Sequence, residues 1–144
     1  MAHAPQVVCC GEGMLELSRR DGQAKLAWSG DTLNTAVHLA RMGLRTSYLT
    51  AVGTDPFSDE MVAGWETEGL DCSLVLRHPT RVPGLYAIST DSEGERSFTY
   101  WRGESAAKEM FALPQMAEAR AAAARARLFY FSLISLAILP DEGR

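Results

Sequence analysis

The sequence predicts an α/β protein built on a parallel sheet that is flanked by helices. Apolar runs alternate with helical segments of about a dozen residues along the first half of the chain, the pattern of successive strand-helix-strand units. With 144 residues, 47% of them apolar, the chain has enough apolar material for a packed core. It shows no leader with a basic then apolar layout and no apolar run of about 18 residues, so a cytoplasmic protein is expected.

Charge and cysteine content argue against several functions. The net charge is −4, and no Lys/Arg cluster is interleaved with aromatic residues, so we expect neither nucleic-acid binding nor membrane association. Cys9, Cys10 and Cys72 form no Cys-x-x-Cys pair and have no His at ligand spacing. They are predicted to be buried, reduced thiols, with no metal.

The first elements are predicted as strands. "QVVCCG" is a short apolar run closed by glycine and indicates a buried strand. "MLELS" and "KLAW" alternate around the turn at Asp21-Gly22, which is typical of a hairpin.

The segment "SGDTLNTAVHLARMG", residues 29–43, predicts an amphipathic helix that ends at Gly43. "TSYLTAVG" follows as a strand. A second helix begins with Asp55 as N-cap and Pro56 in the first turn, and it stops at Gly69. "CSLVL" is the next predicted strand.

The second half departs from this alternation. "GLYAISTDSEGERSFTYWR" predicts a hairpin with a loop of about four residues. "LPQMAEARAAAARA" predicts a helix, and "RLFYFSLISLAIL" predicts one long apolar strand. The final "LPDEGR" has the composition of a helix's first turn, and the last strand lacks a covering element after it, so an incomplete domain is expected.

The entrance of the first helix holds the main candidate site. Asp31 or Thr32 could cap the helix while Gly30 lets the chain turn. Asn34 lies one turn inside, however, where Asn is a poor helix former. Free N–H groups together with Asp and Asn side chains are suited to the hydroxyls of a polyol, so both interpretations stay open.

Two glycine patterns are relevant to nucleotide binding. Gly11-Glu12-Gly13 ends the first strand, where an open α/β sheet places its ligand crevice. It fails as a dinucleotide motif because Glu16 takes the third glycine position and no helix follows. The sequence also contains no Gly-x-x-x-x-Gly-Lys, which excludes a P-loop.

The predicted hairpin carries an aromatic face with an arginine at its edge. Tyr100 and Arg102 end the second strand, and Tyr86 lies on the facing one. This pattern fits a half-buried aromatic face, and it fits equally a lid that excludes water and places Arg102 against an anionic group.

Together these segments resemble the N-terminal half of the ribokinase-like (PfkB) family of sugar kinases. The positions that match its first signature are Gly30, Asn34, Ala36, Gly43 and Gly53. Ser29 departs from it, since the family usually has Gly or Ala there. The blocks "GDTLNTAVHLAR", "VGTDPFSDEM", "PGLYAISTD" and "GERSFTYWR" are similar to those of members that act on a keto-deoxy sugar acid.

The resemblance implies a ribokinase-like fold with a small β-lid formed by residues 14–28 and 85–101, and a homo-oligomer that uses this lid. It implies transfer of phosphate from ATP, with Mg²⁺, to the C6 hydroxyl of a small sugar acid in Entner–Doudoroff-type breakdown. The residues that the resemblance assigns to substrate binding are Gly30, Asp31, Thr32, Leu33, Asn34, Tyr86, Tyr100 and Arg102.

The family's second signature, Asp-Thr-x-Gly-Ala-Gly-Asp, does not occur in these residues. It supplies the catalytic aspartate, so residues 1–144 are expected to be the N-terminal portion of one kinase domain, inactive alone, with the catalytic and ATP-binding half beyond Arg144. Two alternatives remain: a fructokinase or ribokinase of the same fold, and a non-catalytic module that binds sugar or dimerises.

Overall fold

The central sheet is parallel and lies between two layers of helices. A computed structural model describes residues 5–20 and 22–141. The sheet has the order β5-β4-β1-β8, and its pairs are parallel. The strands are β1 (Val7–Cys10), β4 (Thr46–Val52), β5 (Val75–Arg77) and β8 (Leu128–Phe131). The predicted α/β class is thereby confirmed.

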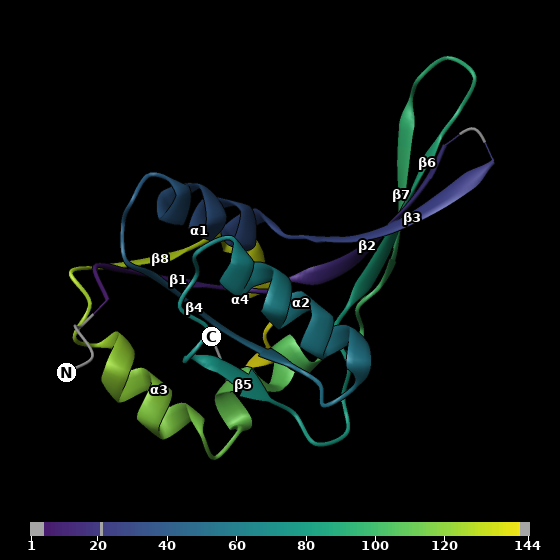
Figure 1. Ribbon diagram of the computed structural model, residues 1–144. Helices are drawn as coiled ribbons and strands as arrows, with labels where there is room; N and C mark the ends of the chain where they lie inside the picture. Colours follow the sequence, from purple (N-terminus) through teal and green to yellow (C-terminus); the bar gives the residue numbers. More distant parts are fainter. Residues whose placement is uncertain (1–4, 21, 142–144) are drawn as a thin grey trace.

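Alternate side chains of the central strands point into two separate cores. Val7 and Cys9 pack in the core beneath the first two helices, whereas Val8 and Cys10 pack in the opposite core with the later ones. Figure 1 shows these layers. The helices are α1 (Asp31–Arg41) and α2 (Pro56–Thr67) on one face, with the 3₁₀ helix η1 (Ala106–Ala112) and α3 (Met116–Ala123) on the other.

The core beneath α1 and α2 is centred on two aromatic residues. Trp65 and Tyr48 are both fully buried, with ring centroids 5.4 Å apart in an edge-to-face arrangement. Trp28 meets Trp65 in the same way from the outer side, at 6.4 Å. These contacts fix α2 against β4.

The predicted buried cysteines lie in the two cores. Cys9 and Cys10 are buried, and Cys72 is half-buried. Burial raises the pKa of the Cys9 thiol to about 11 and that of Cys10 to about 12. These two thiols therefore remain protonated near neutral pH and act as small apolar side chains.

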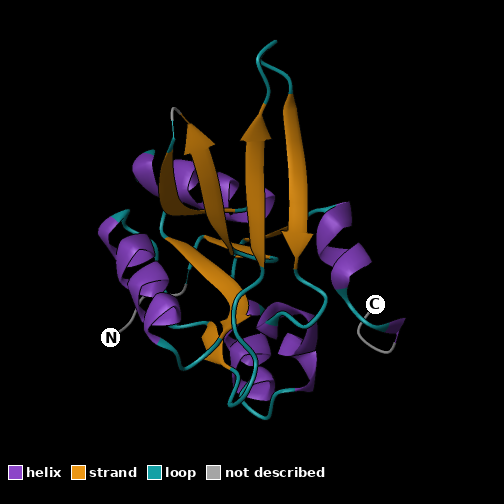
Figure 2. Ribbon diagram, turned by 90° about the vertical axis from the view of Figure 1, so that its right-hand side faces the viewer, coloured by secondary structure: helices purple, strands orange, loops and turns teal. Residues whose placement is uncertain are grey.

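A second sheet projects from this body, and we call it the outer sheet. Its order is β3-β2-β6-β7, with β2 and β6 parallel and the other pairs antiparallel. Figures 1 and 2 show its strands rising away from the helices. The strands are β2 (Met14–Arg20), β3 (Gln23–Ser29), β6 (Leu85–Thr90) and β7 (Arg96–Trp101). Both predicted hairpins are confirmed, and pairing of β2 with β6 joins them into one sheet.

The turns agree with the predicted glycines in part. Gly22, Gly43 and Gly69 have positive φ angles, as a hairpin turn and two helix ends require. Asp21 lies outside the described residues. The loop between β6 and β7 has five residues, Asp91 to Glu95, one more than predicted.

The end of the chain differs from the prediction. The apolar run predicted as a single strand is strand β8 followed by a helix, α4 (Leu133–Ile138). Ser132 causes the change: its hydroxyl accepts a hydrogen bond from Ser135 N, and Ser135 Oγ accepts one from Ser132 N. The expectation that nothing follows the last strand was therefore wrong, since α4 follows it.

Three other boundaries differ. Strand β5 begins at Val75 because Cys72 and Ser73 belong to a turn closed by the bond from Val75 N to Cys72 O. Helix α3 is shorter than predicted, and η1 precedes it where no helix was predicted. Within the described residues, no helix is long and apolar enough to cross a membrane.

Candidate functional site

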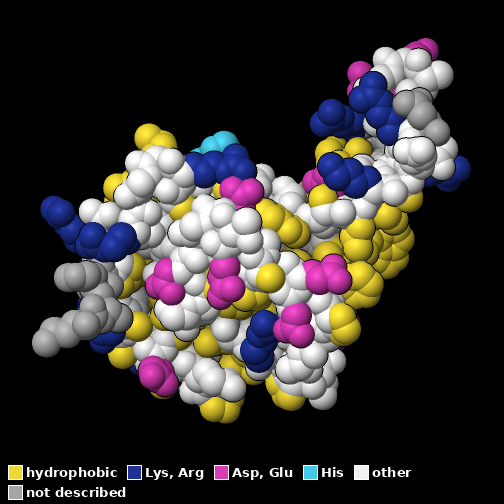
Figure 3. Space-filling view, viewed as in Figure 1, with side chains coloured by type: hydrophobic (Ala, Val, Ile, Leu, Met, Phe, Trp, Pro, Cys, Tyr) yellow, Lys and Arg dark blue, Asp and Glu magenta, His cyan; other side chains and the backbone are white. Residues whose placement is uncertain are grey.

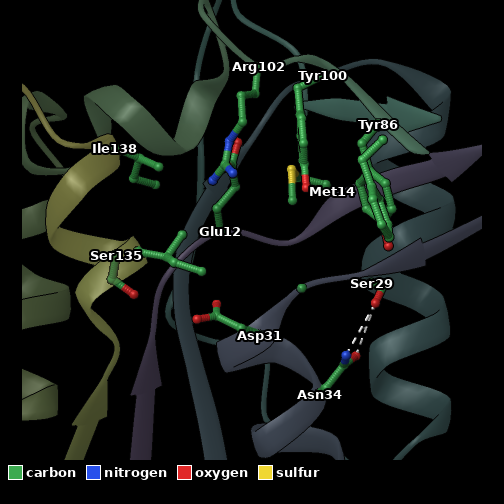
Figure 4. A pocket seen from close by; sticks show the side chains of 13 residues that line it. Glu12, Met14, Ser29, Asp31, Asn34, Tyr86, Tyr100, Arg102, Ser135 and Ile138 are labelled. Atoms are coloured by element: carbon green, nitrogen blue, oxygen red, sulfur yellow. Dashed lines mark hydrogen bonds and ion pairs between the residues drawn. The ribbon is translucent and has the colours of Figure 1, made fainter. Parts of the chain in front are cut away.

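A cavity of about 280 Å³ opens where β1 ends, between the start of α1, the outer sheet and α4. Figure 4 shows side chains from all four regions converging on it. Open α/β sheets place ligands at this carboxyl edge of their strands. The lining residues are Glu12, Met14, Ser29, Gly30, Asp31, Asn34, Tyr86, Phe98, Tyr100, Arg102, Ile134, Ser135 and Ile138.

The start of α1 contributes polar groups to the cavity. Gly30 is the N-cap, and a Cβ placed on it would lie 2.4 Å from the carbonyl oxygen of Glu12, so only glycine fits there. Asp31 is exposed at the helix mouth and accepts a hydrogen bond of 2.7 Å from Thr32 N. Asp31 is the first helical residue and the N-cap is Gly30, so the interpretation that Asp31 or Thr32 is the N-cap was wrong.

Asn34 is bound to Ser29 across the strand-to-helix joint. Its amide nitrogen donates to Ser29 Oγ at 3.2 Å, and Ser29 Oγ lies 3.3 Å from its amide oxygen. Figure 4 shows this pair at the edge of the cavity. The amide is thereby oriented while the side chain stays exposed.

Two predicted site residues do not line the cavity. Thr32 and Leu33 are both fully buried in the core. Thr32 Oγ1 lies 3.1 Å from Tyr48 Oη, and Leu33 packs with the apolar residues beneath α1. The helical period turns these two side chains inward while Asp31 and Asn34 face out.

The outer sheet forms an aromatic wall. Tyr86 pairs with Tyr100 across the strands, with ring centroids 5.8 Å apart, and Phe98 lies 6.3 Å from Tyr86. The Tyr86 hydroxyl donates a hydrogen bond to Glu16. Burial, together with this carboxylate, raises the pKa of Tyr86 to about 12, so the phenol stays neutral.

Arg102 forms an ion pair at the base of this wall. Its Nη2 contacts Glu12 Oε2, and its guanidinium carbon lies 5.8 Å from the centre of the Tyr100 ring. The Glu12 side chain is only 2% exposed, whereas that of Arg102 is 24% exposed. The cavity thus has an arginine–glutamate ion pair at one end and, at α1, an end rich in hydrogen-bonding groups.

Sequence reasoning missed seven lining residues. Glu12 was considered only as part of a nucleotide motif, although its place two residues after the end of β1 was a usable signal. Ser29 is the small residue before the matched glycine. The α4 residues could not be found, because that segment was predicted as a strand. The missed residues are Glu12, Met14, Ser29, Phe98, Ile134, Ser135 and Ile138.

The described part of the chain brings together no cluster of three His, Cys, Asp or Glu residues that could hold a metal ion. Its sequence has no P-loop motif either. The cavity offers hydrogen-bonding groups and one arginine–glutamate ion pair to a small polar molecule.

Fold and site together define an α/β protein with a cavity at the carboxyl edge of its parallel sheet, beside a projecting outer sheet. Residues 6–143 match the model of the pfkB family of carbohydrate kinases, and the chain belongs to this family.

Individual members of the family are similar to nearly the whole of this chain. The chain is 45% identical over 143 residues to 2-dehydro-3-deoxygluconokinase of Escherichia coli K12, covering 96% of this chain and 46% of the relative. It is similar to the crystal structure of 2-dehydro-3-deoxygluconokinase from Thermotoga maritima, with 26% identity, a TM-score of 0.79, and coverage of 94% of this chain and 43% of the other.

Another similar structure is a fructokinase from Xylella fastidiosa with bound ATP. It shares 25% identity and a TM-score of 0.65, over 71% of this chain and 32% of the other. This chain thus spans less than half the length of each of these relatives.

Proposed function

We propose that the chain is the sugar-binding portion of a kinase that phosphorylates the C6 hydroxyl of 2-dehydro-3-deoxygluconate with ATP. One observation carries this: Arg102 lines the same cavity as Gly30, Asp31 and Asn34. Residues 1–144 are then the N-terminal portion of one kinase domain, and the strands within 14–28 and 85–101 are its lid.

The two ends of the cavity suit the two ends of such a substrate. Asp31 accepts hydrogen bonds from sugar hydroxyls, and Asn34 can both donate and accept. At the other end, the Arg102 guanidinium binds the carboxylate, with Tyr86 and Tyr100 as walls that exclude water. A neutral sugar would leave the guanidinium donors that Glu12 does not engage without an anion to bind.

ATP is the proposed phosphate donor, with Mg²⁺ to neutralise charge on the transferring group. The relative with bound ATP supports ATP use within this fold. The catalytic aspartate is expected beyond Arg144. The part played by the described residues is to hold the sugar and its acid end.

Fructokinase is the second candidate, because fructokinases occur among the similar proteins. The Arg102 side chain distinguishes the two candidates, because only the sugar acid has a carboxylate for it to bind. In the full-length gene product, turnover measured by coupled ADP release is expected with 2-dehydro-3-deoxygluconate. Arg102→Ala should raise KM for this acid about 10- to 100-fold, the value of a charge-assisted contact.

The matched control is Arg41→Ala, at the far end of α1, where the arginine pairs with Glu68 on the surface. It should keep the wild-type KM. Turnover of fructose with none of the acid would contradict the proposed substrate.

We further propose that the full-length protein is a homo-oligomer that associates through the outer sheet. The supporting observation is the exposure of apolar side chains on its cavity-side face, where Phe98 is 49% exposed and Tyr100 52%. Figure 3 shows apolar side chains along this projection and Lys and Arg toward its tip. Sedimentation should give a dimer that Phe98→Lys dissociates; a monomeric wild type would contradict this.

A further inference from the structure

Glu12 is a charged residue buried at the base of the cavity. Its side chain is 2% exposed, and it lies two residues after the end of β1. A carboxylate removed from water in this way requires a counter-charge, and the Arg102 guanidinium supplies it. The two residues are 90 positions apart in the chain, so the contact is made by the fold.

The backbone around Gly84 holds this pair in place. A Cβ added to Gly84 would lie 2.6 Å from Glu12 Oε1 and 3.0 Å from the Cβ of Arg102. The Glu12 carboxylate therefore has no space to move toward Gly84. Its position is set by the end of β1 on one side and the start of β6 on the other.

The contact leaves part of the Arg102 guanidinium available. Arginine carries five N–H donors in a planar fork, and the ion pair with Glu12 is made by Nη2. Nε is buried and has no hydrogen-bond partner among the described residues. Nε is therefore closed to a ligand, but the Arg102 side chain as a whole is 24% exposed and Glu12 engages it only through Nη2, so Nη donors remain for a second anion.

We propose that Glu12 is a positioning residue: it fixes the Arg102 guanidinium at the cavity so that its remaining donors bind the substrate carboxylate. This inference rests on the proposed function, since it needs an acidic substrate. It explains why an arginine stands here. A lysine ammonium is a point charge that Glu12 would engage without leaving a second, planar set of donors.

The test is a double-mutant cycle in the full-length gene product. KM and kcat for 2-dehydro-3-deoxygluconate are measured for wild type, Glu12→Ala, Arg102→Ala and the double variant. Glu12→Ala should raise KM about tenfold or more with kcat little changed. In the Arg102→Ala background it should add nothing further, because Glu12 acts through Arg102. Independent, multiplying effects would overturn the inference.

Arg102→Lys keeps a positive charge beside Glu12 and so preserves folding even where Glu12→Ala does not. It should raise KM as far as Arg102→Ala does, and a wild-type KM would overturn the inference. Glu12→Gln retains an oxygen acceptor and should lie between wild type and Glu12→Ala. If wild type does not turn over the acid, the proposed function fails and this inference with it; turnover with multiplying effects refutes this inference alone.

Discussion

The two sheets of the molecule are built in opposite ways. Every residue of β4 in the central sheet is buried, whereas every residue of β7 in the outer sheet is exposed. Apart from its largely exposed edge strand β8, the central sheet is stabilised by apolar burial on both faces, and the outer sheet by its hydrogen-bond ladder and its cross-strand aromatic contacts. Folding stability and the proposed ligand selectivity are therefore expected to depend on different parts of the chain.

The largest expected difference in stability between the two sheets comes from removing one tryptophan side chain that packs on the central sheet and one that belongs to the outer sheet. Trp65→Ala should lower the free energy of unfolding by about 3–5 kcal/mol, because the indole is fully buried against Tyr48. Trp101→Ala is the matched change in the outer sheet, where the side chain is 59% exposed, and should cost less than about 1 kcal/mol. Urea unfolding measures both, and equal losses would refute the separation.

A smaller loss of folding stability is expected when one glycine near each sheet is replaced by alanine. Gly11→Ala places a Cβ 2.1 Å from Thr32 Oγ1 and 2.8 Å from Ser135 Oγ, so the core must shift. We expect a loss of about 1–3 kcal/mol in unfolding free energy. Gly103→Ala, just after β7, meets nothing within 4 Å and should be nearly neutral. A neutral Gly11→Ala would show that the edge of the central sheet is more yielding than its packing indicates.

The smallest expected effect concerns the Tyr86 hydroxyl. Tyr86→Phe keeps the aromatic wall but removes the hydrogen bond to Glu16, at a cost of about 1 kcal/mol. The folded-state pKa of Tyr86, about 12, exceeds its ordinary value of 10.0. Its contribution is therefore complete below pH 10 and is lost as pH rises through 12.

Unfolding measured across this alkaline range should show a shallower loss of stability for Tyr86→Phe than for wild type. Tyr100→Phe, whose ring is half exposed, is the control and should follow wild type. Parallel curves for all three proteins would contradict the assigned role of the Tyr86–Glu16 bond.

Local sequence signals predicted well those features of the fold that depend on a few adjacent residues, such as the ends of helices. Asp55 accepts a hydrogen bond from Ser58 N at the predicted N-cap, and Gly69 adopts the predicted positive φ, because both are properties of a few adjacent residues. The residues from Leu128 to Ile138 were mispredicted because a short apolar run fits a strand and a buried helix equally. The Ser132–Ser135 capping box was the signal that separates them.

The candidate site was predictable only in part for a similar reason. Asp31, Asn34, Tyr86, Tyr100 and Arg102, which the resemblance assigns to substrate binding, line one cavity. The pairing of Glu12 with Arg102 joins residues 90 positions apart and depends on how β1, β6 and β7 come together. No pattern within a single segment of the sequence could predict this contact between residues that are far apart in the chain.

The joint between β3 and α1 limits how this molecule can vary. The strand ends at Ser29 and the helix begins at Asp31, so a single residue, Gly30, separates the outer sheet from the polar helix mouth. An insertion there would change the spacing between the two walls of the cavity. The five-residue tip from Asp91 to Glu95 lies at the other end of the outer sheet, so changes in length among relatives are expected at that tip and not at the joint.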